Sequence, residues 1–532
     1  MNICTTVYNP RFKLISLPFY ALVLYFSLSS YCHAHAEGHS RDGIVIKHLS
    51  SLKLGSFNQS AAEIVAYAPK IQTAFVTNSE KSSLEIISLT KPSQPSLIKS
   101  VDLSDFGSPT SVAVSHNIVA VSLISAKPQE KGSLVILDNN GTVLNTFKTG
   151  SGPDMVTFTP NGDTILVANE GEPNNDYTVD PEGSISILKL TADIKKLDQS
   201  SIKVADFKEF NKKPLVDSVR VFGKNATPAE DFEPEYITVS KDSKTAWVSL
   251  QENNAIAVIN IDDAQIVDII GLGFKSFESA KNGIDASDKD GEINIKGWPV
   301  KGMYQPDTIA NFEFDGQNYI VTANEGDSRD YDGYSEETRV AKASLDKSLK
   351  KAHPGLTKKS NLGRLKITTA NGDTNGDGKL DELYTFGARS FSIWHESGKQ
   401  VYDSGSQLGR IIAQRYPRLF NDGDTRSDNK GVEPESLVIG KIDHQVYAFI
   451  GLERSSGIMA YNVTNPNDVY FSDYFTNVSP ALDNDDPNKG DLGPEGLTFI
   501  STENSPIDQP LLLAANEISG TLSVYLIEQR KH

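Results

Sequence analysis

The chain has 532 residues and a formal net charge of −18, with 69 acidic and 51 basic side chains. A field of this sign disfavours nucleic acid and anionic membrane surfaces and favours divalent cations as partners. Both cysteines, Cys4 and Cys32, lie near the N-terminus, so no disulfide is expected in the rest of the chain.

The first 36 residues have the pattern of a secretory signal peptide. Two basic residues precede an apolar run from about residue 14 to 28, and Ala34-His35-Ala36 forms a small-x-small cleavage site. No stretch reaches the roughly 18 apolar residues that a membrane-spanning helix needs. We therefore expect cleavage near Ala36, no membrane span in the mature chain, and a secreted or periplasmic protein.

A strand-rich repeat follows the signal peptide. Each full copy contains a proline, an acid, an alternating strand, a polar turn, an apolar strand and a glutamate. Period-two alternation rich in Val, Ile, Tyr and Phe predicts β-strands. Five copies are clear and two, the first and second, fit more loosely. The copies begin at Glu63, Thr110, Asp154, Glu235, Asp307, Glu435 and Glu495.

The repeat predicts an all-β chain folded as a seven-bladed β-propeller with long inserted loops. A blade of four strands takes about 40 to 50 residues, so the longer gaps between copies hold a blade plus an insertion. The longest gap contains the strand-like segment 382–405, which leaves an eighth blade open. We expect residues 37–532 to form a single propeller domain, with a calcium-loop insertion around residues 360–385.

A propeller gathers one acid from the start of each first strand and one from the end of each second strand on the same face, because the two strands are antiparallel. The expected pairs are Glu63 with Glu80, Asp154 with Glu170, Glu235 with Glu252, Asp307 with Glu325, Glu435 with Glu453, and Glu495 with Glu517. Close like charges raise one another's pKa or recruit a cation. The alternative is that these acids accept backbone N–H bonds from the neighbouring blade and only hold the ring together.

Two of the second strands end in Asn-Glu-Gly, at residues 169–171 and 324–326, and each leads into an acid-rich loop. Carboxylate oxygens are ligands for Ca²⁺ or Mg²⁺. The candidate metal ligands are Glu170, Glu172, Asp176 and Asp180 in the first segment and Glu325, Asp327, Asp330 and Asp332 in the second. The alternative for the loop acids is a solvated surface.

The segment DTNGDGKLDE, from residue 373, matches the start of a calcium-binding loop. Its candidate ligands are Asp373, Asn375, Asp377, the Lys379 carbonyl and Asp381. Tyr384 stands where an EF-hand has its last glutamate, and the flanks are strand-like, so we expect a stand-alone calcium loop. A weaker relative supplies Asp288 and Asp290 but has Ala286 at its first position.

The sequence contains no G-x-S-x-G, H-E-x-x-H or phosphate-binding glycine-loop motif, and its nine histidines are scattered. Catalysis would therefore need carboxylate-bound metal and an arginine, which suits phosphate esters. Arg329 and Arg389, near the acidic loops, are the candidate phosphate-binding residues.

Several strings resemble the choice-of-anchor I family of secreted bacterial proteins, among them LVANEGEPNNDYTVDPEGS, VTANEGDSRDYDGYSEE, FGARSFSIW and GDLGPEGLTFI. The resemblance spans residues 45 to 528. Similar proteins are often labelled alkaline phosphatase, and mesenchyme-specific cell-surface glycoproteins look like relatives. The resemblance thus implies phosphate esters or cell-surface components as partners besides divalent cations.

The sequence is compatible with two functional hypotheses. The first is a secreted calcium-binding propeller that acts as an extracytoplasmic binding or surface module. The alternative is a metal-dependent phosphoesterase, similar to alkaline phosphatase or phytase, so whether the protein is an enzyme stays open. Loss of stability on chelation would favour the first, and metal-restored turnover of an aryl phosphate the second.

Overall fold

The computed structural model describes residues 43–483 and 486–530. The predicted signal peptide and its cleavage site lie outside these residues. Within them, strands dominate and the α-helices are short: α1 (Pro228–Asp231), α2 (Lys347–Ala352) and α3 (Gln407–Arg415). Among the described residues, no helix has the length and apolar character needed to cross a membrane.

Seven sheets in the described residues have four antiparallel strands each. The first three are β2 (Val65–Ala68), β3 (Thr73–Asn78), β4 (Ser83–Ser88) and β5 (Ser96–Asp102); β6 (Ser108–Ser115), β7 (Ile118–Ile124), β8 (Lys131–Asp138) and β9 (Val143–Ser151); and β10 (Pro153–Phe158), β11 (Thr164–Asn169), β12 (Ser184–Lys189) and β13 (Ile202–Asp206). The next two are β14 (Pro234–Val239), β15 (Thr245–Leu250), β16 (Ala255–Asn260) and β17 (Gln265–Gly271); and β20 (Ile309–Phe314), β21 (Gln317–Asn324), β27 (Ser390–His395) and β28 (Gln400–Asp403). The last two are β29 (Pro434–Ile442), β30 (Gln445–Leu452), β31 (Ile458–Asn462) and β32 (Tyr470–Phe475); and β33 (Pro494–Ile500), β34 (Leu511–Asn516), β35 (Thr521–Gln529) and β1 (Ile44–Lys53).

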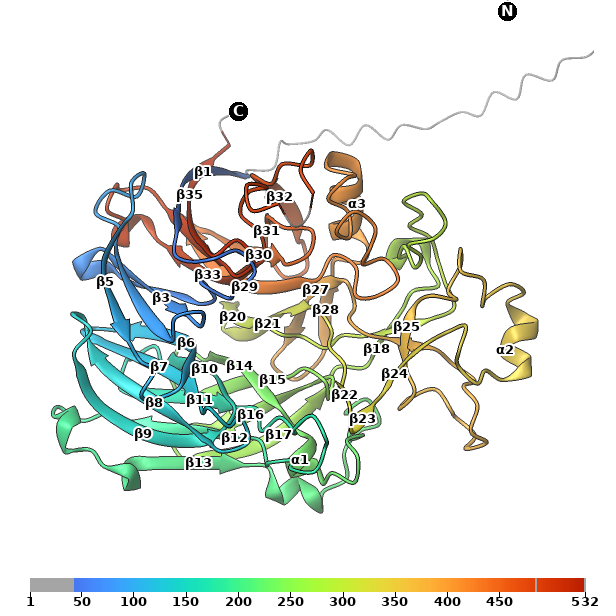
Figure 1. The fold of residues 1–532 in the computed structure, drawn as a ribbon, viewed down its shortest axis with the longest axis horizontal. Coiled ribbons are helices and arrows are strands. Elements are labelled where there is room, and N and C mark those ends of the chain that lie inside the picture. Colours follow the sequence, from blue (N-terminus) through green and yellow to red (C-terminus); the bar gives the residue numbers. More distant parts are fainter. Residues whose placement is uncertain (1–42, 484–485, 531–532) are drawn as a thin grey trace, which may run out of the picture. The chain divides into compact units, whose positions relative to one another are not determined.

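The first strands of these sheets contact one another in a closed circle. Strand β2 contacts β6, and the contacts continue through β10, β14, β20, β29 and β33 back to β2. In Figure 1 the sheets follow one another around a common centre, with β1, in blue, beside β35, in red. The first strand of the described residues, β1, thus completes the last sheet, with Ile44 opposite Gln529. This closed arrangement is a β-propeller.

Each first strand begins at or within two residues of the start predicted for its repeat copy. The all-β prediction is therefore confirmed. The segment 382–405 does not form a further four-stranded sheet. Its strands β27 and β28 continue the sheet of β20 and β21, and its first strand, β26 (Tyr384–Thr385), belongs to a small three-stranded sheet.

The insertion between β21 and β27 contains smaller pieces of structure. Its strands are β22 (Asp330–Tyr331) paired with β23 (Tyr334–Ser335), and β24 (Glu337–Arg339) paired with β25 (Lys366–Thr368). A three-stranded sheet joins β18 (Phe274–Ser276), β19 (Lys301–Met303) and β26 (Tyr384–Thr385). Short 3₁₀ helices punctuate the chain at Pro69–Ile71, Ile194–Lys196, Gln199–Ser201, Lys208–Asn211, Ala280–Asn282 and Thr502–Asn504.

The core lies between neighbouring sheets. Strands β3, β11 and β34 are buried along their whole length, whereas β5, an outer strand, is exposed at six of its seven residues. A strand covered on both faces needs apolar side chains at successive positions, which explains the apolar runs of the second strands. Phe75 of β3, for example, packs in one cluster with Val112 and Val121 of the next sheet.

Candidate functional site

The Asn-Glu-Gly segments hold a glutamate at the end of a second strand. The Asn169 side chain donates to the carbonyl of Ser184, at 3.0 Å, and fastens the end of β11 to β12. Asn324 likewise donates to Ser392 Oγ of β27, at 2.8 Å. The glycine that follows has a positive φ, 76° at Gly171 and 94° at Gly326, where the chain turns away. The glutamate between them is thus fixed between an anchored strand end and a turn.

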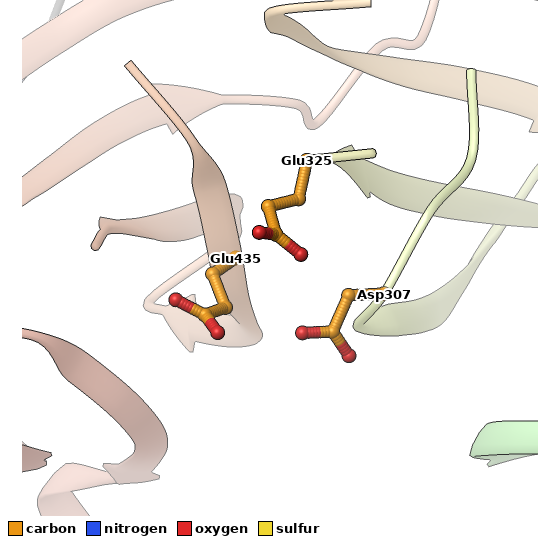
Figure 2. A group of neighbouring side chains, drawn as sticks. All are labelled: Asp307, Glu325 and Glu435. Carbon is orange, nitrogen blue, oxygen red and sulfur yellow. The ribbon is translucent and has the colours of Figure 1, made fainter. Parts of the chain in front are cut away.

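Three carboxylates from two sheets converge beside the centre of the ring. Asp307 precedes β20, Glu325 follows β21 and Glu435 lies at the start of β29, and Figure 2 shows their side chains directed toward one another. One oxygen of each lies within 4.8 Å of the others. We call Asp307, Glu325 and Glu435 the carboxylate trio. Glu325 also forms a second such group with Glu433 and Glu453.

Burial raises the pKa values of these acids, and their mutual repulsion adds to the shift. The pKa of Glu453 rises to about 8, and the pKa values of Asp307 and Glu435 lie well above the ordinary range. The same causes raise the pKa of Glu63 to about 8, and burial with repulsion from Glu172 raises that of Asp154 to about 7. The predicted convergence of acids from several repeats is therefore present.

Basic side chains compensate the group of Glu325, Glu433 and Glu453. Lys430 Nζ lies 2.5 Å from Glu325 Oε1 and 3.8 Å from Glu433 Oε2. Arg426 donates to both oxygens of Glu433, at 2.7 and 2.8 Å. Arg454 pairs with Glu453 at 2.6 Å. This second group thus already contains protein cations.

The acids on the β10 and β14 side have less compensation. The side chains of Glu235 and Glu252 belong to residues that are only 8% exposed, and in each the buried Oε2 has no hydrogen-bond partner within the described residues. Glu235 faces Glu252, Asp307 and Glu170, whose charges raise its pKa further beyond the effect of burial. Each of these oxygens therefore lacks a hydrogen-bond donor among the described residues.

A cavity of about 320 Å³ lies among the inner strands of the sheets. Its lining includes carboxylates from four sheets, those of Glu63, Asp154, Asp307 and Glu495, together with Tyr236. Ring closure therefore places acids that are far apart in the sequence around one space.

The two acid-rich loops contact each other. Tyr331 donates to Glu172 Oε1 at 3.2 Å, and Asn175 donates to Asp332 at 2.5 Å. Of the predicted loop ligands, Glu170, Glu172 and Asp327 interact with the central acids. Asp176, Asp330 and Asp332 are exposed, and Asp180 is half-buried beside Arg329. Their role as metal ligands stays a prediction.

One expected pair is wrong. Glu80 is exposed and accepts the backbone N–H of Ser56 at 2.8 Å. Ser79, which directly follows the strand-end Asn78, takes the place of the glutamate and hydrogen-bonds to Glu63. The same one-residue offset occurs after β15, where Gln251 follows the strand and donates to Glu325 Oε2 at 3.0 Å.

The predicted calcium loop is already wrapped around its first aspartate. Asp373 accepts the N–H groups of Gly376, at 2.7 Å, and Gly378, at 2.8 Å, and these bonds lower its pKa. Asn375 donates to Asp381 at 3.0 Å. Asp377 pairs with Lys379 at 2.7 Å. Calcium binding here stays a prediction, since the loop is exposed and its acids form neither of the close groups above.

The weaker calcium-loop candidate, which contains Asp288 and Asp290, pairs with basic side chains. Asp288 pairs with Arg364 and, at 2.6 Å, with Lys289, and these bases lower its pKa against the opposing effect of burial. Asp290 accepts from Asn294 Nδ2 at 3.2 Å. Asp288 therefore already forms ion pairs with two basic side chains, and a metal ion would have to displace them.

Both candidate phosphate-binding arginines are buried and engaged. Arg329 is 1% exposed and pairs with Asp231 and, at 2.9 Å, with Glu233. Arg389 donates to the carbonyls of Asp285, at 2.6 Å, and Asn429, at 2.5 Å. The ion pairs and hydrogen bonds of both side chains given above are therefore made to other residues of the protein.

The sequence analysis missed three charged residues of the site: Glu233, Glu433 and Lys430. Glu233 and Glu433 precede the repeat proline, in Glu-Pro-Glu segments whose first acid was not considered. That signal was available. Lys430 carries no repeat signal, because it lies in a loop between α3 and β29.

Comparison with known proteins gives a family and distant relatives. The model of the choice-of-anchor I domain matches residues 63–466. Gigasin-3a of Magallana gigas is 29% identical over an alignment of 194 residues that covers 33% of this chain and 68% of that protein. The mesenchyme-specific cell surface glycoprotein of Strongylocentrotus purpuratus is 26% identical over an alignment of 282 residues that covers 45% of this chain but only 36% of that protein.

Two solved structures match most of the chain at low sequence identity. Kuenenia stuttgartiensis hydrazine synthase has a TM-score of 0.46 and 13% identity, covering 88% of this chain and 96% of that one. The Cps50 (Swd1) β-propeller domain of Myceliophteria thermophila has a TM-score of 0.43 and 7% identity, covering 90% and 99%.

Proposed function

The chain belongs to the choice-of-anchor I domain family, and we propose that it is a secreted calcium-binding β-propeller that acts as an extracytoplasmic binding or surface module. In this proposal the seven four-stranded sheets of the described residues are the blades of one propeller. Ca²⁺ is the favoured ion, with Mg²⁺ or another divalent cation as the alternative. Cell-surface components are the proposed partners, since one relative is a cell surface glycoprotein by name.

The observation that carries the proposal is the carboxylate trio. Two unit charges 4 Å apart repel by about 4 kcal/mol at an effective dielectric constant near 20. Lys430 pairs with Glu325 but makes no ion pair with Asp307 or Glu435 among the described residues. A hard cation that takes oxygen ligands would relieve the repulsion and replace the protons that the raised pKa values otherwise retain.

The phosphoesterase alternative would need an arginine that reaches a phosphate beside the cations. The buried contacts of Arg329 and Arg389 give that role no support. Metal-dependent hydrolysis of an aryl phosphate, lost in the Glu325→Gln variant, would be the result in its favour.

The proposal is tested by thermal unfolding of the mature protein after treatment with EDTA and then with added Ca²⁺. A ligand at a hundredfold excess over its Kd stabilises the folded state by about 2.7 kcal/mol. We expect a higher Tm with Ca²⁺ and a reduced rise in Glu325→Gln. Asp373→Asn separates the exposed loop from the trio, and the exposed Glu313→Gln is the matched control. A Tm that ignores both EDTA and Ca²⁺ would remove the basis of the proposal.

A further inference from the structure

A second cavity, of about 260 Å³, lies between the sheet of β29 to β32 and the sheet completed by β1. Its lining combines residues after β30 with residues from the loop that follows α3. We propose that this cavity is a binding site for a small organic anion, with the negative head at Arg418, Arg454 and Ser455 and a compact apolar body against Phe57 and Leu492. The charge of this ligand is opposite to that of the metal ion proposed at the carboxylate trio.

The charge of the cavity is unusual for this chain. Three basic and two acidic residues line it, on a protein whose net charge is −18. Arg454 is already paired with two carboxylates, Glu453 at 2.6 Å and Glu433 at 3.6 Å. Arg418 is exposed, and its side chain makes no ion pair with a residue in the described ranges. Arg418 is therefore the lining cation whose charge is left for an anion.

Two donors at the cavity lack hydrogen-bond partners among the described residues. Ser455 is 1% exposed, and its hydroxyl has no hydrogen-bond partner among the residues described. The buried Nε of Arg454 also has no hydrogen-bond partner there, and its nearest carboxylate oxygen, Glu433 Oε2, is 3.6 Å away. An unpaired buried donor costs free energy that an acceptor on a ligand recovers. A carboxylate, sulfonate or phosphate head supplies such acceptors, and its hydrogen bonds to guanidinium groups are the strong, charge-assisted kind.

The rest of the wall is apolar. Phe57, Leu419, Val478, Leu492 and Ile518 line the cavity. Phe57 and Ile518 are partly buried and pack against the apolar cluster between the sheets that begin with β20 and β29. A cavity with an apolar wall and a few convergent polar groups is typical of small-molecule sites. The apolar side selects against a bare inorganic anion, because a ligand body must replace water there.

The test uses 4-fluorobenzoate and its neutral counterpart 4-fluorobenzyl alcohol, titrated into the mature protein and followed by ¹⁹F NMR. We expect saturable binding of the benzoate, about tenfold or more tighter than the alcohol. Arg418→Gln should weaken benzoate binding about tenfold and Ser455→Ala about threefold. Arg415→Gln, the same charge change at a neighbouring arginine outside the cavity, should leave it unchanged.

Arg418 is exposed, so its replacement leaves the fold intact, which circular dichroism verifies. Absence of saturable benzoate binding, equal affinity for benzoate and alcohol, or equal benzoate affinity in Arg418→Gln and the wild type would each overturn the proposal. The titration is run in EDTA and again with Ca²⁺. Benzoate binding in EDTA supports this site whether or not the protein binds calcium, so the two proposals fail separately.

Discussion

Replacing Lys430 by methionine distinguishes the stability that this protein cation contributes at Glu325 from the stability that a bound metal ion contributes there. The side chain of Lys430 is 14% exposed, and its Nζ lies 2.5 Å from Glu325 Oε1 and 3.7 Å from Asp327 Oδ1. Removing one partner of a buried ion pair leaves an uncompensated charge and costs about 3 to 5 kcal/mol. We expect a loss of about 3 kcal/mol in EDTA, because Gln251 still donates to Glu325 at 3.0 Å.

Ca²⁺ should increase the free energy of unfolding more in the Lys430→Met variant than in the wild type. In the variant, Lys430 no longer competes with the metal ion for Glu325. The assay is urea denaturation followed by tryptophan fluorescence, with EDTA or with Ca²⁺. Lys241→Met is the control: Lys241 pairs with Glu313 at 3.0 Å but is 80% exposed, so its loss should cost less than about 1 kcal/mol. Equal losses in the two variants, or an equal effect of Ca²⁺ on Lys430→Met and the wild type, would refute this reasoning.

Three further predictions concern protonation, closure and the insertion. Burial raises the pKa of Glu63 to about 8 and of Asp154 to about 7. The stability that protonation of these two carboxyls contributes is therefore complete below about pH 4 and is lost as the pH rises toward 8. The Tm in EDTA should fall between these pH values, and Ca²⁺ should make the fall smaller. A pH-independent Tm in EDTA would contradict this. Ile46→Ala in β1 should cost about 2 to 4 kcal/mol by urea denaturation, because Ile46 is 2% exposed in the closing sheet, and a cost below about 1 kcal/mol would mean that β1 adds little to closure. Arg389→Ala should cost about 3 kcal/mol or more, because it leaves the carbonyls of buried loops unpaired, and a neutral effect on Tm would count against its structural role.

Much of the fold could be predicted because the repeat controls local structure. The second strands are buried on both faces, so they read as apolar runs, and the prolines and acids mark the starts of the first strands. The strand-end asparagine is also a repeated signal: Asn169, Asn324 and Asn516 donate to residues of the third strand. The convergence of acids followed from antiparallel geometry within each sheet together with closure of the ring.

Other features of the site depend on contacts that no local pattern contains. Ser79 replaces Glu80 beside Glu63 because the strand ends at Asn78, one residue earlier than the alignment of glutamates implies. Lys430 reaches Glu325 across 105 positions of sequence, and its loop has no counterpart in the other repeats. Such pairings require the three-dimensional arrangement of the insertions.

The most direct measurement is a crystal structure of the mature protein grown with Mn²⁺, whose anomalous scattering identifies the metal. Mn²⁺ takes the oxygen ligands that Ca²⁺ prefers. The account predicts an anomalous peak between the carboxylates of Asp307, Glu325 and Glu435, which disappears on addition of excess EDTA. Well-ordered carboxylates with no peak between them, at a Mn²⁺ concentration that fills other sites in the same crystal, would contradict it.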